Sequence, residues 1–292
     1  MANLKEIKNR ITSIASTMQI TSAMKMVSAA KLRRAQDAIT QMRPYAEKLQ
    51  EILVNVSGTL DLSENAYAEE RDVNKILIIA VSSNRGLCGG FNNNITKRVN
   101  HLLLNDYKGK NVSILTIGKK VNDVFKHSNR NIRPEELGGA EEVFNDLTFE
   151  RAAEYAQFAM NQFKKGEFDK VVIVYNQFKN AAVQEIITEQ LLPIATQVDD
   201  TSTSNSADYI FEPSKEEIIV DLIPKTLKLQ LFKALLDSYA SEHGARMTAM
   251  HKATDNAADL KKNLTLEYNK ARQAAITNEI LEIVGGAEAL NG

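Results

Sequence analysis

The sequence predicts an α/β fold in which a turn-rich unit with a mainly parallel sheet lies between two long helical segments. Glycine and proline are placed unevenly along the 292 residues: residues 1–57 contain no glycine and one proline, and residues 225–284 contain one glycine and no proline. Residues 58–224 hold nine of the thirteen glycines and fourteen of the eighteen aromatic residues. With 43% hydrophobic residues, the chain can form a core of one large or two ordinary domains.

The first segment, residues 3–57, is rich in strong helix formers. Its apolar residues recur at spacings of three and four, with two phase shifts: Leu4, Ile7, Ile11, Ile14 and Met18, then Ile20, Met24 and Val27, then Ala35, Ala38, Met42, Tyr45, Leu49, Ile52 and Val56. This seam is typical of a coiled coil. The seam passes Pro44 in phase, so we expect a kink there and not an end. At about 1.5 Å per residue, a helix over this segment is about 80 Å long, so we expect it to pack against a partner helix.

The last segment supplies that partner. Ser214 is a candidate N-cap, and Glu217 completes a capping box. Pro224 is expected to kink this helix or to delay its start. Later seams consist of Ala253, Ala257, Leu260 and Leu264, and of Ile276, Ile280, Ile283, Ala287 and Leu290. The two segments are expected to pair as an antiparallel coiled coil, which divides the chain into residues 1–57, a central α/β domain at 58–212, and residues 213–292.

The middle of the chain alternates strand and helix patterns. Apolar runs predict strands at 75–83, 111–117 and 170–175, with a fourth candidate at 185–188, and helical patterns lie near 92–105, 119–127 and 148–165. This alternation favours a mainly parallel sheet. The polar stretch 197–208 is expected to be an exposed loop. The longest strongly apolar run, Ile76–Val81, is too short to span a bilayer, and no signal peptide is expected.

The net charge of −1 conceals two charged segments. Residues 1–43 carry eight Lys and Arg against Glu6 and Asp37, and residues 196–221 carry seven acidic residues against Lys215. A basic segment can bind nucleic acid. However, no aromatic or glycine residue lies among these charges, as single-strand binders require. A helix face that meets an acidic protein surface is therefore favoured, and no nucleic-acid partner is expected.

The stretch Ser82–Asn92 (SSNRGLCGGFN) is the most motif-like part of the sequence. A strand that leads through glycines into a helix can cradle phosphate, but neither GxxxxGK[ST] nor GxGxxG is present. A strand-to-helix turn with glycines at special backbone angles is favoured, although Arg85 remains a candidate for binding an anion or a partner. Cys88, the only cysteine, is expected to be structural and not a nucleophile.

The sequence offers no further catalytic or metal motif. HExxH, CxxC and GxSxG are missing, and His243 and His251 are eight residues apart, too far for a shared metal site on a helix. We therefore expect no catalytic residue, no metal and no cofactor. Arg272 and Gln273 are long polar side chains beside alanines. Their pattern leaves open a specific contact with a partner or a solvated face.

Several of these stretches together resemble the γ subunits of F-type ATP synthases. The matching motifs are ITSAMKMVSAAK at 20–31, RGLCGGFN at 85–92, QLLP at 190–193, EHGARMTAMHKATDN at 242–256 and NKARQAAI at 269–276. They occur in the same order along the whole chain. The resemblance implies an antiparallel coiled coil of the two terminal helices with a Rossmann-like α/β domain at its foot.

The resemblance also implies a function. A γ subunit is the rotating central shaft inside a ring of three α and three β subunits, and it couples ion flow through the membrane sector to ATP synthesis or hydrolysis at the β sites. It has no active site of its own. Its foot contacts the ε subunit and the ring of c subunits, which implies a peripheral protein. With Cys88 alone and no transit peptide, we expect the cytoplasmic face of a bacterial plasma membrane.

The resemblance assigns partner contacts to individual residues. Arg272 and Gln273 match the pair that engages a β-subunit catch loop, and Met24 and Lys25 lie on the N-terminal helix that faces this region. Phe211 and Glu212 match an aromatic-acidic pair that meets the c-ring. Three departures affect these assignments: Phe211 stands where tyrosine is common, Gln19 and Ser22 where lysines often occur, and Asn84 where aspartate is frequent.

One alternative remains from the sequence. In this alternative, the chain is a stand-alone α/β enzyme or binding module with a coiled-coil arm for dimerisation. Turnover of ATP or another substrate by the isolated chain distinguishes this alternative from the shaft.

Overall fold

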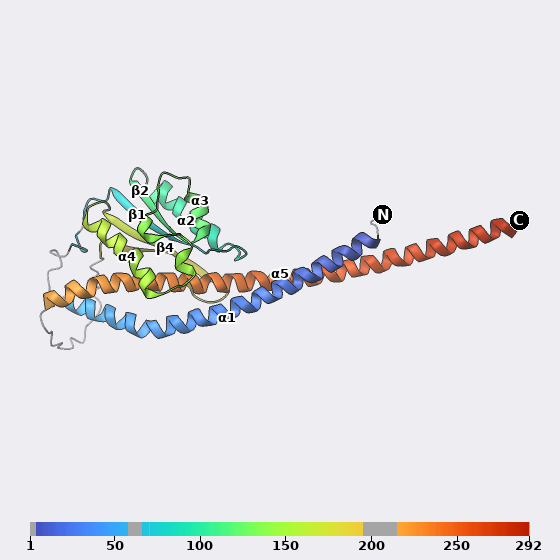
Figure 1. The fold of residues 1–292 in the computed structure, drawn as a ribbon, viewed down its shortest axis with the longest axis horizontal. Helices are drawn as coiled ribbons and strands as arrows, with labels where there is room; N and C mark the ends of the chain where they lie inside the picture. The colour runs from blue at the N-terminus through green and yellow to red at the C-terminus, as the bar shows by residue number, and fades with distance from the viewer. Residues whose placement is uncertain (1–3, 58–65, 70, 195–214, 292) are drawn as a thin grey trace. The chain divides into compact units, whose positions relative to one another are not determined.

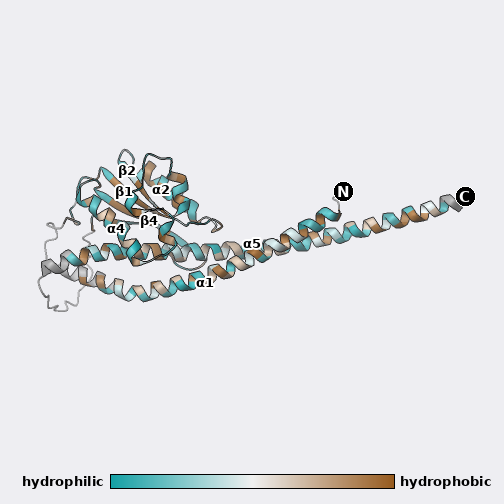
Figure 2. Cartoon of the chain, in the orientation of Figure 1, coloured by the Kyte–Doolittle hydropathy of each residue, from teal (hydrophilic) through white to brown (hydrophobic). Residues whose placement is uncertain are grey.

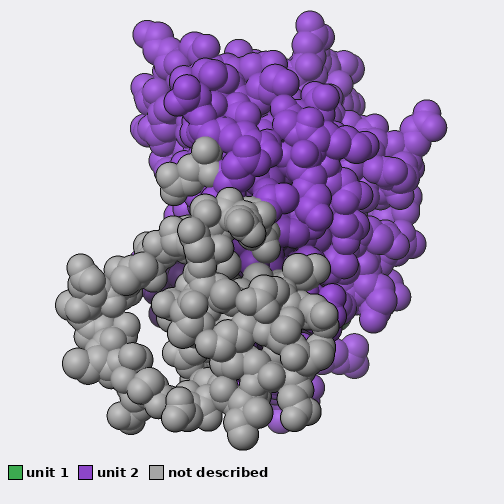
Figure 3. All heavy atoms as spheres, turned by 90° about the vertical axis from the view of Figure 1, so that its left-hand side faces the viewer, with its two compact units in different colours: residues 1–28, 247–292 green, residues 29–246 purple. Residues whose placement is uncertain are grey.

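The computed structural model describes residues 4–57, 66–69, 71–194 and 215–291 (Figure 1). The chain forms two compact units. Unit 1 comprises residues 1–28 and 247–292, and unit 2 comprises residues 29–246 (purple in Figure 3). Each of the two long helices contributes one part to each unit.

The two long helices confirm the helical prediction for both ends of the chain. Helix α1 runs from Leu4 to Ser57 and passes through Pro44, and helix α5 runs from Lys215 to Asn291. The expectation that Pro224 delays the start of α5 is wrong, because the helix begins before it. Ile223 and Leu227 beside this proline are buried in the core of unit 2, so packing outweighs the lost backbone hydrogen bond. The predicted N-cap Ser214 lies outside the described residues.

Unit 2 contains a five-stranded sheet in the order β3-β2-β1-β4-β5. The strands are β1 (Lys75–Val81), β2 (Asn111–Ile117), β3 (Asn131–Ile132), β4 (Lys170–Phe178) and β5 (Gln184–Leu192). Strands β1 to β4 are parallel, and β5 runs antiparallel to β4. The mainly parallel sheet is therefore confirmed. The prediction missed β3 and found only part of β5.

Three shorter α-helices pack around this sheet: α2 (Phe91–His101), α3 (Lys119–Phe125) and α4 (Phe149–Lys164). A π-helical turn, Leu102–Asp106, follows α2, and two 3-10 turns, Glu135–Leu137 and Glu142–Phe144, precede α4. The helices expected near 92–105, 119–127 and 148–165 are thus confirmed in place, and the first ends as an α-helix earlier than expected.

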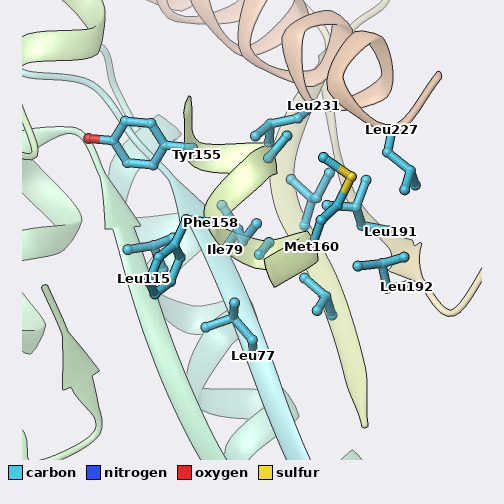
Figure 4. Packing of buried hydrophobic residues seen from close by; sticks show 14 of the residues in the cluster. Leu77, Ile79, Leu115, Tyr155, Phe158, Met160, Leu191, Leu192, Leu227 and Leu231 are labelled. Atoms are coloured by element: carbon cyan, nitrogen blue, oxygen red, sulfur yellow. The ribbon is translucent and has the colours of Figure 1, made fainter. Parts of the chain in front are cut away.

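The sheet has a hydrophobic core on each face. One core joins Ile76 and Ile78 of β1 to Ile95 of α2 and Val121 of α3. The other joins Leu77 and Ile79 of β1 to α4 and α5; Figure 4 shows Phe158, Met160, Leu227 and Leu231 gathered there. Ile76 to Val81 are all fully buried, because helices cover both faces of a parallel strand. The first half of α5 is therefore part of the α/β unit.

Candidate partner-binding surfaces

In unit 1, helices α1 and α5 lie side by side and run in opposite directions (Figure 1). The Oγ1 atoms of Thr21 and Thr254 are 2.7 Å apart and share a hydrogen bond between the helices. Ser28 and Ala257 are also buried in this part of the chain. Small side chains at the contact let two helices approach closely, so this pairing confirms the expected antiparallel arrangement.

Arg272 and Gln273 are exposed on α5, while Met24 and Lys25 are half-buried on α1. Thr21 is level with Thr254, and Arg272 lies eighteen residues beyond Thr254. At about 1.5 Å per residue this is about 27 Å along α5. Met24 and Lys25 lie further still, on the other side of Thr21. The structure therefore places these four residues on two separate surfaces of unit 1.

The C-terminal part of α5 carries exposed apolar residues, and Figure 2 colours hydrophobic positions along this helix brown. They are Ile276 (47% exposed), Ile280 (54%), Leu281 (63%), Ile283 (71%) and Val284 (54%). The sequence placed three of them on a coiled-coil seam. In the described part of this chain no helix covers that seam, so it is available to another protein.

In unit 2, the carboxyl end of β1 leads into the predicted strand-to-helix turn at residues 82–90. Gly89 has a φ of 59°, and Leu87 has a φ of 63°. The side chain of Asn92 closes the turn, because its Oδ1 accepts from the Ser83 amide at 3.0 Å and its Nδ2 donates to Cys88 Sγ at 3.2 Å. The predicted turn is confirmed. Leu87 is the unexpected residue, since it has left-handed backbone and is 65% exposed.

The carboxyl edge between β1 and β4 is the place where open α/β sheets usually bind ligands. On the other side of β1, between β1 and β2, the chain itself closes the same edge of the sheet. Gly118, at the end of β2, lies so close to β1 that an added Cβ atom would be 2.1 Å from the carbonyl oxygen of Ser82. Asn84 joins the same edge to a neighbouring loop: its Nδ2 donates to the carbonyl of Glu141 at 2.7 Å. These contacts leave a closed turn and not a phosphate cradle.

Helix α5 covers this edge with a buried charged cluster. Arg246 donates through Nη1 to Glu242 Oε1 at 2.7 Å, through Nη2 to the carbonyl of Arg85 at 3.1 Å and through Nε to the carbonyl of Gly86 at 3.3 Å. Both charged side chains are less than a tenth exposed. Burial raises the pKa of Glu242, and the attraction of Arg246 opposes this rise.

His243 lies beside this ion pair. Its Nδ1 is 3.4 Å from Arg246 Nη1. A guanidinium can only donate, so Nδ1 accepts and the ring proton is on Nε2. Burial, together with the charges of Arg246 and Lys31, lowers the pKa of His243 to about 3. The imidazole is therefore neutral at physiological pH. It packs edge-on against Tyr239, with ring centroids 4.5 Å apart.

A second buried polar group lies nearer the start of α5. Glu189 of β5 accepts from Tyr175 Oη at 2.8 Å and from Gln230 Nε2 at 2.7 Å. Asp237 is buried near this carboxylate. Burial raises the pKa of Asp237 to about 6; Lys233 and Arg43 lower it and Glu189 raises it. Gln230 thus joins α5 to β5, and Tyr175 joins the same carboxylate to β4.

Comparison with known proteins decides the family. A family model described as ATP synthase matches residues 3–290. The ATP synthase gamma chain of Christiangramia forsetii is 60% identical, and that of Cytophaga hutchinsonii is 52% identical, each over the full length of both chains. This chain belongs to the ATP synthase gamma chain family.

Two solved structures of ATP synthases contain chains similar to this gamma chain. A chain of the Tetrahymena thermophila mitochondrial ATP synthase central stalk and c-ring is 25% identical, with a TM-score of 0.58 over 80% of this chain and 99% of that one. A chain of the Euglena gracilis mitochondrial ATP synthase, from a structure of its OSCP, F1 and c-ring, has a TM-score of 0.65 at 20% identity, over 98% of this chain and 94% of that one. The second likeness shows the shared fold.

The gamma-chain motifs fall at different places in the structure. RGLCGGFN forms the turn at the carboxyl end of β1, and QLLP covers the end of β5 and Pro193. Phe211 and Glu212 lie outside the described residues. Within the described ranges, no helix is long and apolar enough to cross a membrane, and no group of three or more His, Cys, Asp or Glu is arranged to hold a metal.

Sequence reasoning about this gamma chain missed the buried cluster of Glu242 and Arg246. Both lie in a stretch that was recognised only as a motif. A signal was present, since Asp237, Ser238, Ser241 and Glu242 interrupt an apolar helix at spacings of three and four. Polar residues on a buried helix face indicate a polar partner inside the protein.

Proposed function

We propose that this chain is the central rotor shaft of an F-type ATP synthase. It couples ion flow through the membrane sector to ATP synthesis or hydrolysis by rotating inside the α3β3 ring. The observation that carries the proposal is the exposed apolar seam from Ile276 to Val284 at the end of a helix of 77 residues. Exposed apolar residues of this kind indicate a protein interface, and the inner surface of the surrounding ring supplies the partner.

The stiffness of the helix pair explains how the chain acts. Helix α5 is about 115 Å long at 1.5 Å per residue, and paired helices resist twisting better than a single helix. The two helices present different residues in different directions. A rotating shaft of this kind gives each of the three β sites a different contact at any moment. The nucleotide chemistry then belongs to β, and this chain has no catalytic residue.

The individual partner contacts belong to the same proposal. Arg272 and Gln273 engage a β-subunit catch loop, for which their exposure on α5 is suitable. Met24 and Lys25 form a second contact with the ring from α1. The excess of basic residues at 1–43 complements acidic loops of the β subunits.

The foot of the chain is assigned to the other rotor subunits. Phe211 and Glu212 contact the c-ring, and the ε subunit binds the central α/β domain. In this proposal the sequence-predicted segments 1–57 and 213–292 form the shaft, and residues 58–212 form the foot. The chain is peripheral, reaches the membrane only through the c-ring, and lies at the cytoplasmic face of a bacterial plasma membrane.

Purification of the complex tests the proposal. The chain should purify with α, β and ε subunits at one copy for every three β, and the isolated chain should not hydrolyse ATP. A complex without β subunits, or steady ATP turnover by the isolated chain, would contradict the shaft and favour an enzyme.

The catch assignment has its own test. Replacement of both Arg272 and Gln273 by alanine should lower ATP-driven proton pumping severalfold, because two polar contacts with the ring are lost. Glu267→Ala together with Asn263→Ala changes exposed polar residues elsewhere on α5 and is a suitable control. Pumping that is equal in both double variants would refute the assignment.

A further inference from the structure

The turn formed by Arg85, Gly86 and Leu87 combines exposure with an unusual backbone. Leu87 is 65% exposed and has a φ of 63°, a conformation that leucine rarely adopts. A residue in such a conformation persists only when its surroundings fix it. The surroundings that fix this turn must therefore be sought in the contacts of its backbone.

Two of those contacts come from one side chain on another element. Arg246 of α5 donates to the carbonyl oxygens of both Arg85 and Gly86, at 3.1 and 3.3 Å. Its remaining nitrogen faces Glu242 at 2.7 Å. A planar guanidinium spreads its donors over three nitrogens and so reaches two carbonyls and a carboxylate from one fixed fork, whereas the ammonium group of lysine is a compact point charge without this fork. Arg246 is thus a direct connection between α5 and the turn.

The position of this connection in the fold is informative. The turn follows β1, the central strand of the sheet, and α5 is the helix that continues from unit 2 into unit 1. Gly244, the only glycine between residues 225 and 284, lies in the same part of α5. An added Cβ atom there would be 3.2 Å from Ala181 Cα, so the helix also lies close to the β4–β5 hairpin.

We propose that Arg246, with Glu242 as its counter-charge, is a positioning residue that fixes the Arg85–Leu87 turn to helix α5, so that sheet and helix rotate as one body. This inference rests on the proposed rotor function and deepens it. Torque that enters the α/β unit reaches α5 through this joint as well as through the apolar core. Without the joint, the turn loses its fixed position and part of the rotation is lost as local twisting.

The test uses the assembled complex with Arg246→Met, which keeps an unbranched apolar stem and removes the donors. Hydrogen exchange of residues 84–90 should accelerate at least tenfold, and protons pumped per ATP hydrolysed should fall at least twofold. Arg246→Lys keeps the charge next to Glu242 but not the fork, and should rescue only part of both losses. Unchanged exchange and unchanged coupling in Arg246→Met, or complete rescue by lysine, would overturn the proposal.

Two further variants separate positioning from general damage. Arg246→Met leaves Glu242 buried without a partner, so Glu242→Gln/Arg246→Met removes that charge as well; it should remain as poorly coupled as the single variant. Recovery of both readouts in the double variant would overturn the proposal. Arg71→Met is the matched control, because Arg71 donates to the carbonyl of Phe163 at 2.9 Å, away from the turn; it should change neither readout.

A failure of the proposal for Arg246 can be distinguished from a failure of the proposed rotor function. If the unmodified chain did not assemble with β subunits, the rotor proposal itself would fail before any variant is compared. If it assembles and pumps, the exchange of residues 84–90 in the variants decides the role of Arg246 alone.

Discussion

Asp237 carries a carboxyl group that is buried on α5, and burial raises its pKa from 3.8 to about 6. At a pH between these two pKa values, Asp237 is protonated in the folded chain and ionised in the unfolded chain. Its contribution to the free energy of unfolding therefore falls as the pH rises from about 4 to 6. Asp237→Asn removes the effect. The free energy of unfolding of the variant, relative to the unmodified chain, should rise by roughly 2.5 kcal/mol from pH 4 to pH 7.

Urea denaturation of the purified chain across this pH range measures the difference. Asp123→Asn, which changes an exposed carboxylate on α3, is the control and should show no comparable rise. A relative stability of Asp237→Asn that does not change with pH would contradict the raised pKa of Asp237.

His243 responds to pH in the opposite direction. Its pKa is lowered from 6.5 to about 3, so the unfolded chain binds a proton that the folded chain excludes. Stability is therefore lost as the pH falls below about 6.5, by about 1.4 kcal/mol per pH unit. In His243→Asn, whose amide oxygen can still accept from Arg246, this loss should disappear, whereas replacement of the exposed His127 should leave it intact. A loss of equal size in His243→Asn would show that another group causes it.

These two groups show what sequence reasoning could not reach at the residue scale. The raised pKa of Asp237 depends first on its burial, and then on charges from three different elements: Lys233 and Arg43 lower it, and Glu189 raises it. Leu87 was equally hidden, because the left-handed conformation is expected of glycine, and Gly86 and Gly89 stand beside it. Cys88 was predicted to be structural; it is buried, and burial raises the pKa of its thiol.

At the scale of the elements, the register of α1 against α5 is open to a direct test. Thr21 and Thr254 face each other with their hydroxyl oxygens 2.7 Å apart. Thr21→Cys/Thr254→Cys should form a crosslink under mild oxidation, seen as a shift on a non-reducing gel. Thr21→Cys/Leu264→Cys is displaced by ten residues, about 15 Å, and should not. Equal crosslinking of both pairs would contradict a fixed antiparallel register.

Gly244 tests the packing of α5 on the β4–β5 hairpin. An added Cβ atom would be 3.2 Å from Ala181 Cα and 3.3 Å from Phe178 Cε2. Gly244→Leu should therefore lower the free energy of unfolding by about 2 kcal/mol, as overpacking does. Gly286→Leu, at a helix position with open space around it, should not lower it. Thermal unfolding measures the stability of both variants. If Gly244→Leu were as stable as Gly286→Leu, the result would contradict close packing of α5 against the β4–β5 hairpin.

The sequence predicted the elements that are long and regular. The run Ile76–Val81 identified β1, because a strand buried on both faces is continuously apolar. β3 has only two residues and leaves no periodic pattern. Most of β5 was missed because its side chains are mainly half-buried and include Gln184, Glu185 and Glu189. The continuation of α5 through Pro224 depends on packing against the core, which local propensity does not contain.

At the scale of the whole molecule, the uneven placement of glycine and proline acquires a physical meaning. The long segments nearly free of these residues form α1 and α5, and the turn-rich middle forms the sheet with its shorter helices. The Rossmann-like unit with its mainly parallel sheet was thus expected from the pattern and from the family resemblance together. The polar contacts by which α5 joins the sheet and the turn after β1 were not, since they join residues at least 40 positions apart in the chain.

Rotation of a probe on the α/β unit tests the central claim most directly. Lys108 is exposed in the turn that precedes β2, and Cys88 is buried, so Lys108→Cys offers a selective site for attaching the probe. In an immobilised α3β3 ring supplied with ATP, the probe should turn continuously in one direction, and it should stop when ATP is removed. Steady ATP hydrolysis with a stationary probe would contradict the account.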